Sequence, residues 1–148
     1  NGFLLGSDSL GRDVASGIVH GAKTSLLIGF VATLVSVFIG IFFGAFAGYF
    51  GGLIDDILMR VTEIFQTIPS FIFAILLVAI MKPSMSSIVI AIAVVSWPGV
   101  ARLVRGEFLA VKNREFVQAC HTLGMSDLRI MLWEILPNCL SPIIVVGS

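Results

Sequence analysis

The feature that most constrains this chain is a run of 31 residues, Thr24 to Ile54, that contains no charged side chain. A helix that rises about 1.5 Å per residue needs roughly 20 consecutive apolar residues to cross the hydrocarbon core of a bilayer. The run exceeds that length. It therefore predicts a first membrane-spanning helix over Ser25 to about Phe50.

Two more uncharged runs follow, 18 residues from Ile64 to Met81 and 19 residues from Pro83 to Ala101. The first predicts a second helix that begins near Ile57, and the second predicts a third helix in which Pro98 introduces a kink. The apolar run that begins at Ile135 predicts the start of a fourth span. Three such runs in 148 residues do not fit the buried helices of a soluble bundle. We expect an all-α, polytopic transmembrane helix bundle with about three complete membrane helices and the start of a fourth.

Composition agrees with a membrane protein, since 57% of the residues are hydrophobic and 12% are charged, about half the charge of an ordinary soluble domain. Nine basic residues balance nine acidic ones, which gives no electrostatic basis for a nucleic-acid partner. The sequence begins without Met and ends inside the apolar run PIIVVGS. We expect residues 1–148 to form a single transmembrane domain of a longer protein, truncated at both ends.

The placement of Lys and Arg predicts the orientation in the membrane, because these residues accumulate on the cytoplasmic side. Residues 102–129 hold five of them, whereas residues 82–87 hold one. We therefore expect residues 102 to about 134 in the cytoplasm and the 82–87 turn outside. Alternation then puts the linker Gly51 to Arg60 inside and residues 1–23 outside.

Small residues recur every four positions along the first predicted helix, which aligns them on one face. They are Ala32, Ser36, Gly40, Gly44 and Gly48. Small side chains let helix backbones approach closely in lipid, where hydrophobicity does not drive association. The stripe predicts a tightly packed neighbouring helix, in the same chain or in a partner subunit. The alternative is that glycine is simply frequent in membrane helices.

The sequence gives little support for an enzyme or a metal site. The segment Ser7 to Gly11 has the serine of a lipase-like nucleophile turn, but it begins with serine instead of glycine, and no Asp lies three residues before His20 or His121. Cys120 and His121 are adjacent, so on a helix they point about 100° apart, and Cys139 adds no metal-binding spacing. We expect free structural cysteines, no catalytic residues and no bound metal.

Signals of nucleotide hydrolysis and of ion transport are also weak. No glycine-rich phosphate loop of the form GxxxxGK(S/T) occurs, so the chain does not hydrolyse nucleotide by that route, and we expect no cofactor. Asp55, Asp56 and Glu63 lie near expected helix ends. A cytoplasmic boundary explains them without an ion path through the membrane.

The expected cytoplasmic loop, residues 106–134, contains a helix–glycine–helix pattern. From Glu115 onwards apolar residues recur at helical spacing, which puts them on one face. They are Phe116, Val117, Cys120 and Leu123. Gly124 suits the left-handed residue that closes such a helix, with Leu123 as the last helical position.

A second helix is expected after this glycine. Ser126 is placed to cap it, and Asp127 lies in its first turn, where a negative charge complements the helix dipole. It runs from Leu128 through Trp133 to Pro137 and returns to the membrane. The first helix either lies flat on the lipid surface or docks into a groove of a cytoplasmic partner, and its amphipathic pattern fits both.

This loop resembles the Glu-Ala-Ala-x-x-x-Gly…Ile-x-Leu-Pro loop of the permeases of binding-protein-dependent ABC importers. The matching residues are Ala119, Gly124, Leu136 and Pro137. Gln118 stands in place of the Glu, Cys120 in place of the second Ala, and Glu134 in place of the Ile.

Three further stretches are similar to the dipeptide, oligopeptide and nickel branch of these permeases. Residues 6–13, GSDSLGRD, resemble its GTDxxGRD segment, and residues 97–105, WPGVARLVR, resemble its WxxxARxxR helix exit. Residues 47–52, AGYFGG, match together with Asp55 and the Met59-Arg60 pair. The resemblance covers nearly the whole chain and is closest to the second of the two permease subunits in that branch.

The resemblance implies a multi-pass protein of a bacterial or archaeal cytoplasmic membrane, embedded in membrane lipid. Its implied partners are a second permease subunit, an extracytoplasmic solute-binding protein and cytoplasmic ABC ATPase subunits, which would use the ATP. The helix at residues 118–124 would be a coupling helix seated in a cleft of the ATPase. The residues expected to form this ATPase-coupling loop are Val117, Gln118, Ala119, Cys120, Leu123, Gly124, Ser126, Asp127, Leu136 and Pro137.

On this basis we predict a permease subunit that forms part of the path for small peptides and is not itself an enzyme. One alternative is a permease for nickel or another small solute of the same branch. Another is a self-contained membrane channel, which would conduct without ATP or a binding protein.

Overall fold

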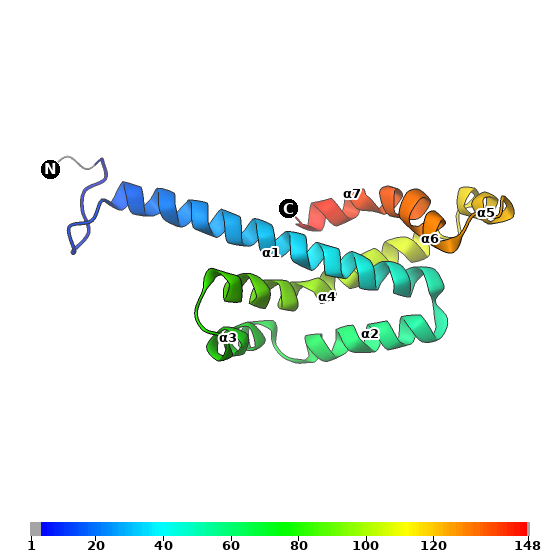
Figure 1. Ribbon diagram of the computed structural model, residues 1–148, viewed down its shortest axis with the longest axis horizontal. Coiled ribbons are helices and arrows are strands. Elements are labelled where there is room, and N and C mark those ends of the chain that lie inside the picture. The colour runs from blue at the N-terminus through cyan, green and yellow to red at the C-terminus, as the bar shows by residue number, and fades with distance from the viewer. Residues whose placement is uncertain (1–3, 148) are drawn as a thin grey trace.

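The computed structural model describes residues 4–147, which are mainly helical and contain one isolated bridge, between Ser7 and Asp13, and no strand. The helices are α1 (Val14–Phe50), α2 (Gly52–Thr67), α3 (Ser70–Ile80), α4 (Met85–Val111), α5 (Glu115–Thr122), α6 (Asp127–Arg129), the π-helical segment η1 (Ile130–Ile135) and α7 (Leu136–Gly147). They form an elongated bundle in which α1 and α4 run side by side along the long axis (Figure 1).

Helix α1 is longer than predicted, since it begins at Val14 and not at Ser25. The Asp13 carboxylate accepts a hydrogen bond from the backbone N–H of Ala15 at 3.1 Å and caps the first turn. No residue between Val14 and Lys23 interrupts the helix, so the charge of Lys23 does not mark where α1 begins. The added turns project from the bundle on the side of the N-terminus (Figure 1).

The small-residue stripe of α1 lies against α4, where backbone meets backbone. All five stripe residues are buried. A Cβ added to Gly40 would lie 2.5 Å from the Cβ of Val100, and one added to Gly48 would lie 2.7 Å from the Cβ of Phe108. A Cβ on Gly44 would collide with the carbonyl oxygen of Ala101. Only glycine permits this approach of the two helices.

A hydrophobic core extends from the α1–α4 contact into the loop and α7. Its buried members are Ala45, Val100, Val104, Phe108, Val111, Val117, Ile130, Met131, Ile135, Cys139 and Ile143. Aromatic contacts attach α2 to this pair, because the Trp97 ring lies 4.7 Å from that of Phe43 and 5.3 Å from that of Phe65.

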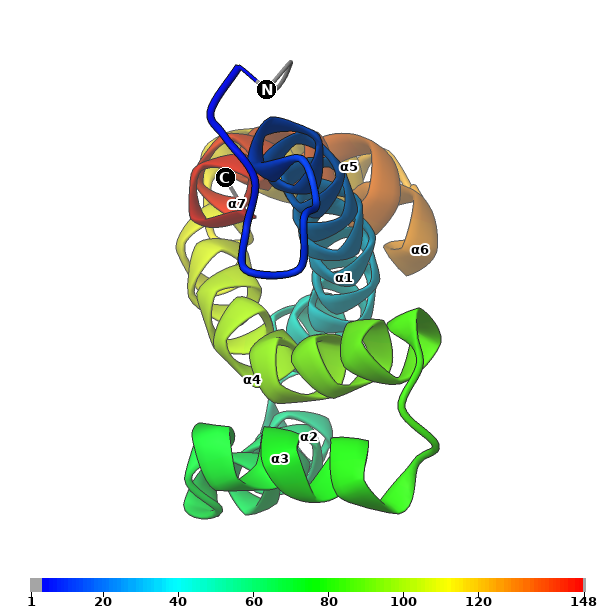
Figure 2. The ribbon, with the colours of Figure 1, turned by 90° about the vertical axis from the view of Figure 1, so that its left-hand side faces the viewer.

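The predicted second helix is wrong in two respects. It begins at Gly52 and not near Ile57, because Gly51 and Gly52, with φ of 62° and 54°, make the turn from α1, so most of the expected linker is helical. It is also broken, since α2 and α3 meet at 82°. Pro69 disfavours helical geometry at Ile68, whose ψ is 127°. Figure 2 shows α3 lying across the end of α2.

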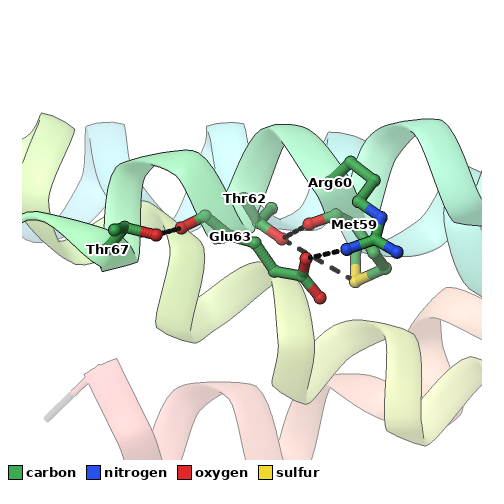
Figure 3. Close-up of polar contacts among 5 residues, drawn as sticks. All are labelled: Met59, Arg60, Thr62, Glu63 and Thr67. Carbon is green, nitrogen blue, oxygen red and sulfur yellow. Dashed lines mark hydrogen bonds and ion pairs between the residues drawn. The ribbon is translucent and has the colours of Figure 1, made fainter.

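Helix α2 carries polar side chains that satisfy one another or the backbone (Figure 3). The hydroxyls of Thr62 and Thr67 donate to the carbonyl oxygens of Met59 and Glu63, at 2.7 and 2.9 Å. Arg60 and Glu63 form an ion pair at 3.0 Å. These local bonds let α2 keep polar residues without breaking its helix.

Helix α4 extends ten residues beyond the predicted exit at Ala101, to Val111, and passes through the buried Pro98 as one helix. The predicted kink at Pro98 stays a prediction. After the loop, α6, η1 and α7 form one continuous helical segment that passes through Pro137. The N–H of Leu136 reaches back five residues to the carbonyl of Met131, which is the π-type bond, and Pro137 contributes no N–H.

Within residues 4–147, three helical segments are long and apolar enough to cross a membrane: α1, α4 and the segment Asp127–Val146. The count rises to four if the bent pair α2–α3 is one broken span. The predicted fold class, an all-α polytopic bundle with about three complete spans, is confirmed.

Candidate functional site: the loop end

Three parts of the chain gather at the end of the bundle opposite the N-terminus (Figure 1). They are the turn between α1 and α2, the last turns of α4, and the segment containing α5 and α6. We call this region the loop end. It holds the predicted coupling loop together with two residue pairs that the sequence does not place together.

Gly124 closes α5 through a Schellman motif. Its φ is 76°, and its N–H donates to the carbonyl of His121 at 3.0 Å. The N–H of Met125 donates to the carbonyl of Cys120 at 3.2 Å, which completes the pair of bonds. Leu123 is the cap residue after the last helical position, Thr122, so the predicted end of the helix is off by one residue.

The predicted apolar face of α5 is divided between the inside and the outside of the molecule. Val117 is fully buried in the hydrophobic core, and Cys120 and Met125 pack against it. Leu123 is 81% exposed, so its predicted place on the same face as Val117 is wrong. Six positions at about 100° each place Leu123 about 120° around the helix from Val117, so the two side chains point in different directions. Gln118 and Ala119 are exposed as well.

Tyr49, near the end of α1, contacts the loop just beyond Gly124. Its hydroxyl donates a hydrogen bond to Asp127 at 2.7 Å and lies 3.4 Å from Nε2 of His121. The rings of Tyr49 and His121 are stacked, with centroids 6.3 Å apart. Asp127 lies in the first turn of α6, as predicted, whereas Ser126 occupies the cap position without a side-chain capping bond.

A second polar pair joins α2 to α4 at the same end. Nε and Nη2 of Arg105 donate to the two carboxylate oxygens of Asp55, each at 2.5 Å. The Asp55 side chain is only 14% exposed. Bidentate, partly buried pairs of this kind are stronger and more directional than single surface ion pairs.

A comparison with known protein families identifies the chain. Residues 40–146 match the model of the binding-protein-dependent transport system inner membrane component. The match covers the α1–α4 contact from Gly40 onwards and the whole loop end. The chain belongs to this permease family.

Individual relatives are similar over almost the entire chain. The di/tripeptide transport system permease protein DppC of Pseudomonas aeruginosa (strain UCBPP-PA14) is 42% identical over 99% of this chain and 48% of its own length. The dipeptide transport system permease protein DppC of Escherichia coli K12 is 46% identical over 98% and 48%. The oligopeptide transport system permease protein OppC of the same strain is 43% identical over 100% and 49%. The chain spans about half the length of these curated relatives.

Family membership confirms the resemblance found in the sequence and makes the chain a multi-pass membrane protein of the inner membrane. The motif stretches that carried the resemblance supply residues of the loop end. Tyr49 belongs to the 47–52 stretch, Arg105 ends the 97–105 stretch, and Asp127 lies in the loop itself. Stretches far apart in the permease sequence therefore meet at one end of the bundle.

The remaining predicted residues of this permease lie in two settings. Leu136 begins α7 and packs against the hydrophobic core, and Pro137 follows it within the helix. Cys139 is fully buried in that core and Cys120 is half-buried, and both are free thiols. No group of three or more metal-binding side chains occurs among the residues that the structure describes.

The sequence did not predict the contacts of Tyr49 with His121 and of Arg105 with Asp55, although all four residues lie in segments that it singled out. The partners are separated by 72 positions for Tyr49–His121 and by 50 for Arg105–Asp55. Helical spacing relates residues three or four positions apart and gives no information about residues separated by 50 or more positions. Their shared presence in the motif stretches was the available signal.

Proposed function

We propose that this chain is the membrane-spanning part of a permease subunit of an ABC importer for small peptides. The observation that carries the proposal is the 42–46% identity, over 98–99% of the chain, to dipeptide permease proteins. The proposed partners are a second permease subunit, cytoplasmic ABC ATPases that consume ATP, and an extracytoplasmic solute-binding protein. No cofactor is proposed for the chain itself, and residues 106–134 are proposed to face the cytoplasm of a bacterial or archaeal cell.

The loop end supports this role because it presents α5 outward while fixing it from behind. Gln118, Ala119 and Leu123 are exposed and form the surface proposed to enter a cleft of the ATPase. On the opposite side of α5, Val117 is fully buried in the hydrophobic core. A helix held in this way moves with the helices behind it, so closure of the ATPase pair would displace them as a rigid body.

The test uses the full-length protein assembled with its partner subunits in proteoliposomes. Ala119→Glu places a charge on the exposed face of α5, and we expect it to reduce ATPase co-purification and peptide uptake at least about tenfold, as for a charge buried unpaired at an interface. Ala22→Glu is the matched control, because Ala22 is also exposed on a helix but lies in the N-terminal part of α1, whose C-terminal end forms part of the loop end. It should leave both quantities unchanged.

Three results would decide between the candidates. Intact ATPase binding and uptake in Ala119→Glu would show that α5 is not the coupling helix. Uptake without ATP or a binding protein would indicate a channel. Nickel uptake that excess dipeptide does not inhibit would indicate that the transported solute is not a peptide but another solute of the same branch.

A further inference from the structure

The contact between Tyr49 and Asp127 is not needed to hold α5 in place. Val117 is buried in the core and Gly124 closes the helix through backbone bonds, so α5 is already attached and shaped. The Tyr49 hydroxyl nevertheless donates to Asp127 at 2.7 Å across 78 positions of sequence. It is a direct side-chain hydrogen bond between α1 and the segment that follows Gly124.

The two ends of this bond belong to different parts of the molecule. Tyr49 follows Gly48, whose missing side chain lets α1 lie directly on Phe108 and Arg105 of α4. Tyr49 is therefore carried by the closely packed α1–α4 pair. Asp127 opens the helical segment that continues through η1 into α7. The bond thus joins the helix pair to the loop at the turn where α5 ends.

The nearby Arg105–Asp55 pair does not make this connection. It joins α4 to α2, and neither residue bonds to α5 or α6 in the described part of the chain. His121 of α5 adds to the Tyr49 contact, since its ring stacks on that of Tyr49 and its Nε2 lies 3.4 Å from the hydroxyl. The hydroxyl of Tyr49 therefore contacts residues on both sides of Gly124.

We propose that Tyr49 and Asp127 are positioning residues that fix the angle of α5 relative to the α1–α4 pair and pass its displacement to α1. This role rests on the proposed function. It predicts that breaking the bond leaves α5 attached and the complex assembled, because Val117 and the Gly124 turn remain. The transport of solute would then follow ATP hydrolysis less closely.

The experiment measures solute transported per ATP hydrolysed by the full-length complex in proteoliposomes. Tyr49→Phe removes only the hydroxyl, and Asp127→Ala removes the acceptor. Each should lower the ratio about three- to tenfold, which corresponds to the loss of one net hydrogen bond. The double variant should fall no further than the single variants, because both remove the same interaction. Asp127→Asn keeps an accepting oxygen and should restore most of the ratio.

Assembly and function are judged separately. The amount of complex purified with Tyr49→Phe should equal that of the unmodified protein, and a failure to assemble would overturn the positioning role in favour of a structural one. Undiminished solute per ATP in Tyr49→Phe, or additive losses in the double variant, would also overturn it. Uptake by the unmodified complex that needs no ATP would instead contradict the proposed function, and the positioning role with it.

Discussion

The α1–α4 pair and the α2–α3 arm of this permease are built on opposite principles. Seven residues of α1 and ten of α4 are buried, whereas Thr62 is the buried residue of α2 and α3 has none among those described. An apolar recess of about 460 Å³ lies between α3 and α4. The pair is fixed by contacts within the chain, while the arm is attached at a few points and exposes most of its apolar side chains.

The difference shows what kind of sequence signal specifies each region. Close helix contact in lipid requires small residues at regular spacing, and the α1 stripe supplies them along its whole buried face. The arm depends on individual residues instead: Pro69 for its bend, and Asp55 and Phe65 for its attachment to Arg105 and Trp97 of α4. Substitutions should therefore affect the pair through packing and the arm through individual bonds.

The largest effect is expected at Gly44, in the middle of the pair. The Cβ of Gly44→Ala would collide with the carbonyl oxygen of Ala101 and lie 2.7 Å from the Cβ of Val104. Since backbone atoms cannot rotate away, we expect a loss of about 3 kcal/mol in the free energy of unfolding, at the upper end for overpacked sites. Unfolding by denaturing detergent in mixed micelles measures it.

Gly29→Ala is the matched control on the same helix, because nothing lies within 4 Å of an added Cβ there. It should be neutral or stabilise by up to about 1 kcal/mol through helix propensity. Equal stability of the Gly44 and Gly29 variants would show that the pair is not held by close backbone contact, and the contrast with the arm would disappear.

The next effect is expected at the attachment of the arm. Asp55→Asn removes the negative charge that Arg105 contacts through two hydrogen bonds. It should lower the free energy of unfolding by about 1 to 2 kcal/mol, because solvent screens part of the attraction between the two charges. Asp56→Asn serves as the control, since Asp56 is exposed and forms no ion pair with the residues described. A loss as large in Asp56→Asn would mean that net charge, and not the bidentate bond, holds α2.

A third substitution tests the effect of backbone conformation at a glycine where an added side chain has no packing partner. Gly124 has a φ of 76° but open space around it, so Gly124→Ala should cost about 1 kcal/mol for the left-handed backbone alone. Gly106→Ala, in α4 and equally open, should cost nothing. The two variants are compared by the same detergent unfolding. If Gly124→Ala were as stable as Gly106→Ala, the Schellman turn would not constrain α5.

Most of the fold followed from charge-free runs, because the length of an apolar helix is set by the thickness of the membrane. The stripe on α1 and the glycine that ends α5 were also predictable, since each depends on residues within one or two turns. The helix start at Val14 was missed because charge alone was taken as the boundary. The break at Pro69 was missed because the run from Ile64 to Met81 was defined by the absence of charge, and a proline carries none.

The candidate site was predictable only in its local parts. Gln118 and Ala119 were placed on α5 correctly, but Leu123 is exposed because it lies six positions after Val117, about 120° around the helix. The bonds from Tyr49 to Asp127 and from Arg105 to Asp55 join residues of four different helices, and no spacing within one helix encodes them. Local pattern predicts elements, and long-range polar pairs require the assembled bundle.

The smallest effect, and the sharpest test of the arm, concerns its bend. Without the ring, Pro69→Ala allows Ile68 to become helical and residue 69 to donate to the carbonyl of Phe65. Spin labels at the exposed positions Ile57 and Ile80 would then lie about 35 Å apart in a straight helix, farther than across the 82° bend. We expect the measured distances to broaden towards that value, with little change in stability.

Pro83→Ala, in the turn before α4, is the control and should leave these distances unchanged. An unaltered distribution in Pro69→Ala would mean that packing of α3 on α4 sets the bend, and the arm would then resemble the pair more than its exposed surface indicates.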